Sequence, residues 1–346
     1  MNETRILVTG GTGYIGSHTV VCLQQAGYDV VVIDNLSNSK IEVLDGIEAI
    51  TGIRPAFVEG DVTNLSTLQK IFSDFPNIEG IIHFAASKAV GESVKKPLLY
   101  YRNNLVSLLN LLELMPENGV KGIVFSSSCT VYGEPDENPV TESTPFQTAT
   151  SPYGNTKQIC EEIITDTVRS GAPFSAVLLR YFNPIGAHPS ALIGELPNGV
   201  PQNLVPYLTQ TAAGIRERLN VFGNDYPTPD GTCIRDFIDV TDLAQAHVKA
   251  VERIVQGLTQ ESVEVFNLGT GRGVSVMELI KTFEDSTGVK VPFVVAPRRE
   301  GDIIQVWADP TRANTVLGWR AEVPLAQTML NAWRWQCRNE NISDPV

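Results

Sequence analysis

The sequence has no long hydrophobic run and little positive charge. Its 346 residues include 26 Lys and Arg against 39 Asp and Glu, so the formal net charge is -13. Nucleic acids and anionic membranes are bound mainly through clustered Lys and Arg, so neither is expected as a partner. No stretch of about 18 apolar residues is present, and the first residues lack the hydrophobic region of a signal peptide. We therefore expect a cytoplasmic protein.

Cysteine and histidine are also scarce. The five cysteines are scattered, without the C-x-x-C spacing that is typical of metal and redox sites, and the four histidines lie far apart in the sequence. This pattern favours reduced structural thiols and predicts no bound metal ion.

Short apolar runs recur through the first half of the chain. They alternate with segments of helical length, which is typical of βαβ units around a parallel sheet covered on both faces. The predicted strands are residues 6–9, 30–33, 56–58, 81–84, 123–126 and 176–179. From residue 184 onward prolines and glycines break this rhythm, although residues 236–256 read as a strand and a helix that return to the first part. We predict a doubly wound α/β protein whose first domain is 1–183 plus about 236–256, with 184–346 as a smaller mixed α/β domain.

A glycine-rich turn follows the first predicted strand. Gly10, Gly13 and Gly16 precede a helical pattern, an arrangement that lets the backbone approach a pyrophosphate at a helix N-terminus. The spacing departs by one residue from the commonest dinucleotide fingerprint, so a purely structural turn is the alternative. Asp34 ends the second predicted strand, where a carboxylate accepts hydrogen bonds from ribose hydroxyls, and no Arg beside it would bind a 2′-phosphate. These features predict a Rossmann-type domain that binds NAD.

Asp61 and Val62 end the third predicted strand, where they are expected to contact the adenine. The alternative for Asp61 is a solvated carboxylate at the end of a strand.

Tyr153 and Lys157 lie four residues apart, on one face of a predicted helix. A phenol has a pKa of about 10, which must fall by about three before the group acts as a base near neutral pH. An ammonium at about 4 Å supplies about 4 kcal/mol at an effective dielectric of about 20, which is enough. Ser128, at the end of the fifth predicted strand, is expected to hydrogen-bond Tyr153 and a substrate oxygen. The alternative is that the Ser128 hydroxyl only caps the following loop.

The glycine turn, Asp34, Ser128, Tyr153 and Lys157 occur in an order that resembles the extended short-chain dehydrogenase/reductase family. Longer strings resemble the UDP-glucose 4-epimerases within it, at residues 10–18, 34–36, 84–93, 181–184, 222–226 and 297–302. The resemblance implies an isomerase that oxidises C4 of a UDP-hexose to a ketone with tightly bound NAD and then reduces it on the opposite face. It would interconvert UDP-galactose and UDP-glucose as a homodimer.

The resemblance also implies which residues form the site. Tyr153, Lys157 and Ser128 would be catalytic. The cofactor-binding residues would be Gly10, Gly13, Tyr14, Ile15, Gly16, Asp34, Asn35, Asp61, Val62, Phe84, Ala85, Lys88, Asn103, Tyr153, Lys157 and Tyr181. The substrate-binding residues would be Lys88, Ser128, Tyr153, Asn183, Asn203, Leu204, Phe222, Arg235, Arg299, Asp302 and Val306. Arginines suit a diphosphate because they make charged, bidentate contacts, whereas a solvated surface Arg is the alternative.

Three positions limit the resemblance. Phe237 and Asp239 stand where related enzymes commonly carry Tyr and His, so no role that needs those two groups is expected here. Val306 stands where some members carry a bulky aromatic residue, and a small side chain would leave room for UDP-N-acetylhexosamines.

Other sugar-nucleotide enzymes of the same fold are the main alternatives. A 4,6-dehydratase needs an acid and a base after Ser128, where this chain has Cys129 and Thr130. A UDP-glucuronate epimerase and a non-catalytic NAD-binding regulator are the other two.

Overall fold

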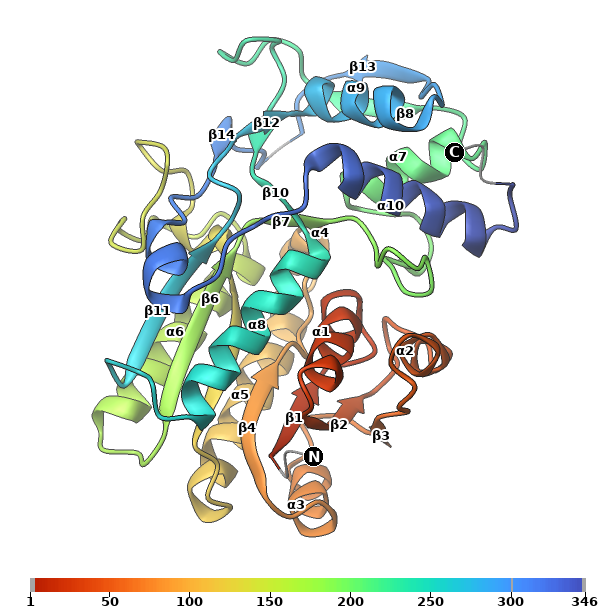
Figure 1. The fold of residues 1–346 in the computed structure, drawn as a ribbon. Coiled ribbons are helices and arrows are strands. Elements are labelled where there is room, and N and C mark those ends of the chain that lie inside the picture. The colour runs from red at the N-terminus through yellow and green to blue at the C-terminus, as the bar shows by residue number, and fades with distance from the viewer. Residues whose placement is uncertain (1–3, 300, 344–346) are drawn as a thin grey trace.

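The apolar runs of the first half form the strands of one sheet in the computed structural model, which describes residues 4–299 and 301–343 (Figure 1). All seven strands are parallel, in the order β11-β6-β5-β4-β1-β2-β3. Their bounds are β1 Arg5–Thr9, β2 Asp29–Asp34, β3 Ala56–Glu59, β4 Ile78–His83, β5 Gly122–Ser128, β6 Ser175–Tyr181 and β11 Val263–Leu268. The predicted parallel sheet is therefore confirmed. β4 ends one residue earlier than expected, so Phe84 lies in the loop that follows it.

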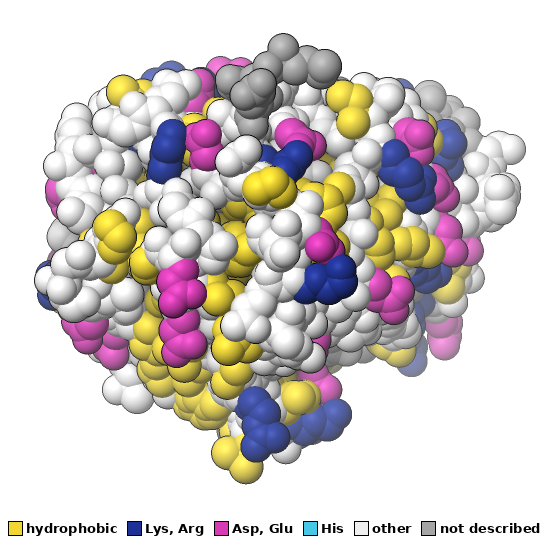
Figure 2. All heavy atoms as spheres, turned by 90° about the horizontal axis from the view of Figure 1, so that it is seen from below, with side chains coloured by type: hydrophobic (Ala, Val, Ile, Leu, Met, Phe, Trp, Pro, Cys, Tyr) yellow, Lys and Arg dark blue, Asp and Glu magenta, His cyan; other side chains and the backbone are white. Residues whose placement is uncertain are grey.

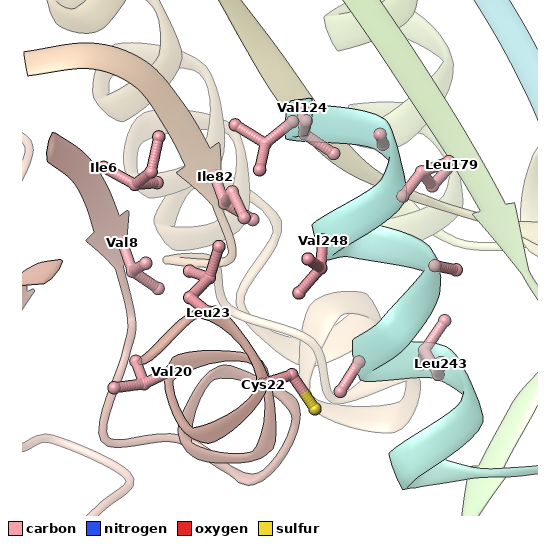
Figure 3. Close-up of a cluster of buried hydrophobic side chains, with 14 of the residues drawn as sticks. Ile6, Val8, Val20, Cys22, Leu23, Ile82, Val124, Leu179, Leu243 and Val248 are labelled. Carbon is pink, nitrogen blue, oxygen red and sulfur yellow. The ribbon is translucent and has the colours of Figure 1, made fainter. Parts of the chain in front are cut away.

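Successive residues of these strands face opposite helix layers, which explains their unbroken apolar character. Ile6 and Val8 belong to one buried cluster and Leu7 to the other. Figure 3 shows the first cluster, in which strand side chains meet side chains of α1 and α8. Helices α1 (Tyr14–Gln25), α2 (Val43–Thr51) and α8 (Val240–Val255) supply this layer. Helices α3 (Leu65–Asp74), α5 (Pro97–Glu117) and α6 (Pro152–Arg169) supply the other.

The direction of chain progression reverses between β1 and β4. From β1 the chain moves outward to β2 and β3, and then it returns to β4 and continues outward through β5 and β6. In open parallel sheets, ligands bind at such a reversal, beyond the carboxyl ends of the strands. The same edge carries the loop to short helix α4 (Val90–Lys95) and the single turn η1 (Cys129–Tyr132).

The second half builds a smaller lobe above this edge of the sheet (Figure 1). Its buried side chains form a separate cluster around Leu279, Phe283 and Trp333. Its helices and strands are β7 Asn183–Ile185, α7 Leu204–Ala212, β8 Leu219–Phe222, β9 Ile234–Arg235, β10 Phe237–Asp239, β12 Val274–Ser275, α9 Val276–Thr287, β13 Phe293–Ala296, β14 Gln305–Val306 and α10 Leu325–Asn339. The π-helical turn η2 (Ala313–Leu317) packs back against α8 and β11.

Part of the second half returns to the large sheet. The helix predicted in residues 236–256 is α8, which covers the sheet beside α1. The predicted strand is β10, but it pairs with β7 in a separate two-stranded sheet and does not join the large one. Strand β11 lies beyond that segment and pairs in parallel with β6, which the sequence analysis did not predict. Among residues 4–299 and 301–343, no helix is both long and apolar enough to span a membrane.

Candidate active site

The glycine turn packs too closely for larger residues. Gly10 has a positive φ of 69°, and a Cβ added to it would lie 2.9 Å from the Ala85 nitrogen. A Cβ on Gly16 would lie 2.2 Å from the Gly10 carbonyl oxygen. Gly13 is the N-cap of α1 and provides no side-chain cap. The turn therefore presents backbone at the positive end of a helix, which fits a pyrophosphate.

Asp34 is tied directly to this turn. One carboxylate oxygen accepts from the Thr12 amide at 3.2 Å, and the other accepts from the Leu36 amide at 3.0 Å and the Ser39 hydroxyl at 3.1 Å. The predicted ribose ligand thus lies beside the predicted phosphate turn. The residue also holds the loop in which Leu36 adopts a φ of 55°.

Asn35 and Asp61 form the outer end of the same region. The Asn35 amide donates to the Asp61 carboxylate at 3.2 Å, and Thr63 donates to it through its amide at 2.8 Å and its hydroxyl at 2.7 Å. Burial opposes ionisation of Asp61, but these hydrogen bonds lower its pKa overall. The adjoining Val62 is buried. The structure therefore brings Asp61 next to Asn35, in agreement with a shared adenosine site.

The loop after β4 forms the opposite wall. The amides of Phe84 and Ala85 donate to the Thr9 carbonyl at 3.0 Å and the Thr9 hydroxyl at 3.2 Å, which brings this loop against the first strand. Asn103 donates to the Ser87 hydroxyl at 3.0 Å, and Lys88 is exposed.

Asn104 was missed by the sequence analysis. Its side chain accepts from the Ser87 amide at 2.8 Å and donates to the Ser87 carbonyl and the Thr156 hydroxyl, both at 3.0 Å. It therefore links the loop after β4 to helix α6. A buried side-chain amide that hydrogen-bonds the backbone of a loop has no local sequence signal, because its partners are distant in the chain.

Helix α6 carries the predicted catalytic pair. Its N-cap, Ser151, accepts from the Gly154 amide at 3.2 Å, and Pro152 occupies the first turn, so the helix begins directly before Tyr153. Tyr153 and Lys157 are both buried and share one face of the helix. The Lys157 nitrogen lies 6.0 Å from the centre of the Tyr153 ring.

The Lys157 side chain is anchored to strand β5. Its ammonium donates to the Ser126 carbonyl at 2.6 Å and lies 4.7 Å from the centre of the Phe125 ring. Burial lowers the pKa of Lys157 to about 8, against the opposing influence of Cys160 and Glu161. The amine is therefore poised to change charge only slightly above neutral pH.

Ser128 ends β5 and contacts both the turn that follows and Tyr153, whereas its role toward a substrate oxygen stays a prediction. Its hydroxyl oxygen accepts from the Thr130 amide at 3.2 Å and so caps the turn that follows. A hydroxyl retains its own proton as a donor, and a hydrogen bond between Ser128 and Tyr153 lowers the pKa of the phenol.

The pKa of Tyr153 differs from our expectation. Burial raises it well above the ordinary phenol value, the neighbouring Tyr181 raises it further, and Ser128 only partly opposes this. We expected the Lys157 charge to bring the pKa near neutrality. In the structure the loss of hydration is the largest influence, so the phenol holds its proton in the chain alone.

The rings of Tyr181 and Phe84 both lie near the imidazole of His247. The ring centres lie 6.1 Å apart for Tyr181 and His247, and 4.7 Å apart for Phe84 and His247. Burial lowers the pKa of His247 to about 4, so this imidazole is neutral at physiological pH. His247 was not singled out from the sequence. Its ring supports two predicted cofactor residues.

Tyr14 and Ile15, the first residues of α1, face different neighbours. The Tyr14 hydroxyl donates to the Gly186 carbonyl at 2.8 Å, which joins the glycine turn to the second lobe. Ile15 packs against the buried cluster under α1.

Arg235 and Val306 are neighbours in the second lobe. They are paired residues of the parallel strands β9 and β14, and Arg235 is close enough to Cys129 to lower the pKa of that thiol, although burial dominates. Arg235 therefore lies beside the strand that ends in Ser128. Val306 is only 2% exposed and packs with Val131 and Phe182.

A second group surrounds Phe222. The Arg299 guanidinium lies 5.5 Å from the centre of the Phe222 ring and donates to the Asp302 carboxylate at 2.7 Å. Both Phe222 and Arg299 are exposed. The motif at residues 297–302, which contains Arg299 and Asp302, also includes Glu300, which lies outside the described residues.

Glu195, a hydrogen-bond partner of Asn203, was missed by the sequence analysis. The Asn203 amide donates to the Glu195 carboxylate at 2.7 Å, and Lys88 also faces Glu195 and lowers the pKa that burial raises. Leu204 begins α7 directly after Asn203, and Asn183 begins β7. Glu195 thus connects a predicted cofactor residue with a predicted substrate residue.

The two departures from the family pattern have structural roles. Phe237 is buried in the core of the second lobe. Asp239 caps α8 by accepting from the Thr241 amide at 2.7 Å, and its other oxygen accepts from the Thr328 hydroxyl at 2.8 Å.

Within residues 4–299 and 301–343, no group of three or more His, Cys, Asp and Glu side chains could hold a metal ion. All five cysteines are free thiols, as expected.

Comparison with known proteins gives a consistent result. A family profile described as GDP-mannose 4,6 dehydratase matches residues 7–331. A UDP-glucose 4-epimerase of Bacillus subtilis is 52% identical over 336 residues, which cover 97% of this chain and 98% of that protein. The chain belongs to the UDP-glucose 4-epimerase family.

Solved structures support this membership of the UDP-glucose 4-epimerase family. The enzyme of Bifidobacterium longum, solved with NAD+ and UDP, has a TM-score of 0.93 and 46% identity, covering 98% of this chain and 99% of that chain. The enzyme of Stenotrophomonas maltophila, solved with NAD and formylated UDP-arabinopyranose, gives the same TM-score, identity and coverage. The predicted Rossmann-type fold and the resemblance are both confirmed.

Proposed function

We propose that the protein interconverts UDP-galactose and UDP-glucose by inverting C4 through a 4-keto intermediate, with NAD as its resident cofactor. The observation that carries the proposal is the meeting of three groups at one edge of a parallel sheet. Ser128 ends β5, Tyr153 and Lys157 lie on the α6 face that packs on it, and the glycine turn follows β1 at the same edge.

The residues at the reversal of the sheet fit NAD. Gly10, Gly13 and Gly16 leave the backbone open at the start of α1, and Asp34 lies where ribose hydroxyls would donate. Phe84, Ala85, Lys88 and Asn103 belong to the opposite wall, which the loop after β4 forms. When bound there, NAD would supply a hydride acceptor, and in its reduced form a hydride donor, for C4 of the sugar.

Tyr153 performs the proton chemistry. As a phenolate, it would remove the proton of the sugar 4-hydroxyl while C4 is oxidised, and it would return that proton to the 4-oxygen once the sugar has rotated. The phenol holds its proton in the chain alone, so the positive charge of bound NAD+ would have to favour the phenolate together with Lys157. Ser128 donates a hydrogen bond to the sugar 4-oxygen. Lys157 stabilises the phenolate that forms when Tyr153 has lost its proton. Because one residue takes and returns the proton, the cycle leaves the enzyme unchanged.

The second lobe holds the UDP group. Arg235 and Arg299 supply fixed positive charge to the diphosphate in a chain whose net charge is -13. Phe222 provides an exposed ring beside Arg299, and Asn183, Asn203, Leu204 and Asp302 complete the set.

We further propose that Val306 permits some turnover of UDP-N-acetylhexosamines. Its strand pairing with Arg235 places this small residue next to a predicted diphosphate ligand. Its nearly complete burial means that a larger residue would have to displace Val131 or Phe182, or extend toward the substrate.

The alternatives gain less support. A dehydratase would require an acid and a base at Cys129 and Thr130, yet burial raises the pKa of the Cys129 thiol to about 12 and a threonine hydroxyl is a poor proton donor. No observation favours a UDP-glucuronate epimerase. An intact set of Ser128, Tyr153 and Lys157 argues against a non-catalytic regulator.

A homodimer is also part of the proposal. Five large apolar side chains of α4 and α5 are exposed: Val90 by 48%, Val94 by 61%, Leu98 by 79%, Leu99 by 48% and Leu109 by 40%. Figure 2 shows hydrophobic side chains gathered closely over one broad area of the face seen from below. Exposed apolar surface of this kind is typical of protein contacts.

The domain division and the location stay predictions. We propose a cofactor domain of residues 1–183 plus about 236–256 and a substrate domain from the rest of 184–346. The five free thiols suit the reducing cytoplasm.

One assay tests the proposed reaction. Purified protein is mixed with UDP-galactose without added NAD, and UDP-glucose is followed by chromatography. Conversion would support both the reaction and a retained cofactor. No conversion, even after NAD is added, would refute the proposal and direct attention to other UDP-sugars.

A further inference from the structure

The catalytic groups of the proposed reaction come from two different elements. Ser128 is the last residue of β5, whereas Tyr153 and Lys157 lie on α6. A proton passes efficiently only when these side chains keep a separation close to hydrogen-bond length. Some contact must therefore hold α6 against the end of β5.

Glu161 makes that contact. It lies one helical turn after Lys157, and its side chain is only 4% exposed. One carboxylate oxygen accepts a short hydrogen bond from the hydroxyl of Ser127, the residue directly before Ser128. Lys157 makes a second link to the same strand through the Ser126 carbonyl at 2.6 Å. The helix is thus attached to two consecutive residues of β5.

Glu161 is itself held by a buried arginine from the next strand. Arg180 of β6 donates to the carboxylate through Nε at 3.0 Å and through Nη2 at 2.6 Å, and its side chain is 7% exposed. The other end of the guanidinium donates to the Tyr132 hydroxyl at 3.0 Å and the Glu142 carbonyl at 3.1 Å. With its own donors occupied in this way, Arg180 fixes the orientation of the Glu161 carboxylate.

We infer that Glu161 is a positioning residue of the proposed epimerase reaction: through Ser127 and Arg180 it fixes the α6 pair, Tyr153 and Lys157, against Ser128. The inference rests on the proposed function. Glu161 does not touch the reacting atoms, and it acts by holding the two elements that carry them.

The charge of Glu161 has a second effect, on Lys157. The carboxylate raises the pKa of the amine against the lowering caused by burial. The other titratable groups that face Lys157 are Cys160 and Tyr153 from α6 and His83 from β4, and Arg180 faces Glu161 from β6. Loss of the Glu161 charge should therefore move the deprotonation of Lys157 to lower pH.

Two variants separate the attachment from the charge. Ser127→Ala removes the link that Glu161 makes between α6 and β5 and leaves the Arg180 ion pair and the Lys157 link in place, whereas Glu161→Gln removes the charge.

The chain offers a matched control in a second buried pair on the same sheet. Arg253 of α8 donates to Glu264 of β11 at 2.6 Å and 2.9 Å, and the side chains are 12% and 1% exposed. Glu264→Gln breaks a comparable pair on the edge strand β11, near the amino end of that strand and so away from the carboxyl end of β5 that carries Ser128.

The measurements are kcat and KM with UDP-galactose, the Kd of UDP by calorimetry, the unfolding midpoint, and kcat as a function of pH. We expect kcat to fall at least tenfold in Ser127→Ala and Glu161→Gln, with the Kd of UDP within threefold of wild type. Glu264→Gln should keep kcat within twofold of wild type, even if its unfolding midpoint falls as far as those of Ser127→Ala and Glu161→Gln. In Glu161→Gln the alkaline limb of kcat should shift down by about one pH unit.

The outcomes test the inference and the proposed function separately. A kcat of Ser127→Ala within twofold of that of Glu264→Gln would overturn the inference, and this holds even if Glu161→Gln fails to fold. Equal loss of UDP binding and kcat would overturn it as well, because the defect would then be a general one. A wild-type protein without epimerase activity would instead refute the proposed function on which the inference rests.

Discussion

Replacing Lys157 by Met is expected to reveal how much stability the site gives up for a buried ammonium. The side chain is 4% exposed, and burial lowers its pKa from the ordinary 10.5 to about 8. At about 1.36 kcal/mol per pKa unit, the protonated amine costs the folded state about 3 kcal/mol. The hydrogen bond to the Ser126 carbonyl is lost in the variant, which costs about 1–3 kcal/mol. At pH 7 the Lys157→Met protein should therefore be as stable as the wild type or slightly more stable.

The pH dependence gives the clearer signal. Between pH 8 and 10.5 the folded chain has released the Lys157 proton while the unfolded chain still holds it. Because the unfolded state then binds more protons, the free energy of unfolding of the wild type rises with pH through this window. Lys157→Met lacks this titration. Its stability advantage should fall by about 3 kcal/mol between about pH 7.5 and 10.5.

Urea unfolding of both proteins, freed of nucleotide and measured at five pH values, tests this reasoning. The difference between the two proteins cancels the titration of other groups. Parallel stability curves across this range would show that the Lys157 amine is not destabilised by burial, and the assignment of a pKa of about 8 would then be wrong.

Three further substitutions test the site. Tyr153→Phe should lower kcat by about 10²–10⁴-fold with an unchanged Kd for UDP, since it removes only the proton-transfer group; a kcat within threefold of wild type would contradict its role. Gly16→Ala should purify without bound nucleotide, measured by absorbance after denaturation, because the new Cβ would lie 2.2 Å from the Gly10 carbonyl oxygen. Full nucleotide content would mean that the turn can move. Val306→Tyr should reduce kcat/KM for UDP-N-acetylgalactosamine relative to UDP-galactose by about 5–200-fold, equal to about 1–3 kcal/mol, and an unchanged ratio would end the proposed steric role.

The sequence predicted the elements of the cofactor half because their signals are local. The run Val30, Val31, Val32 and Ile33 has no polar interruption, and in the structure its residues alternate between two buried clusters. Such a run requires cover on both faces, so it indicates an interior strand wherever its neighbours lie. The helix that carries Tyr153 was likewise predicted from the local sequence.

The missed features depend on partners far away in the chain. The sequence analysis did not single out Glu161 or Arg180. They are buried together because α6, which carries Glu161, packs on β6, which carries Arg180. Glu195 likewise gains meaning only from Asn203 and Lys88. Burial also reversed the expected direction of the Tyr153 pKa, because hydration of a side chain cannot be read from its spacing to a lysine.

The position of β11 has a consequence for how the protein is made. This strand, Val263–Leu268, covers the edge of β6, yet it leaves the ribosome long after the other six strands of the sheet. At about 5–20 residues per second, β6 waits on the order of ten seconds with an unpaired edge. An open edge of that kind recruits strands from other chains. The nascent chain is therefore most prone to aggregate during this interval, and a fragment that ends at residue 183 would keep the exposed edge permanently.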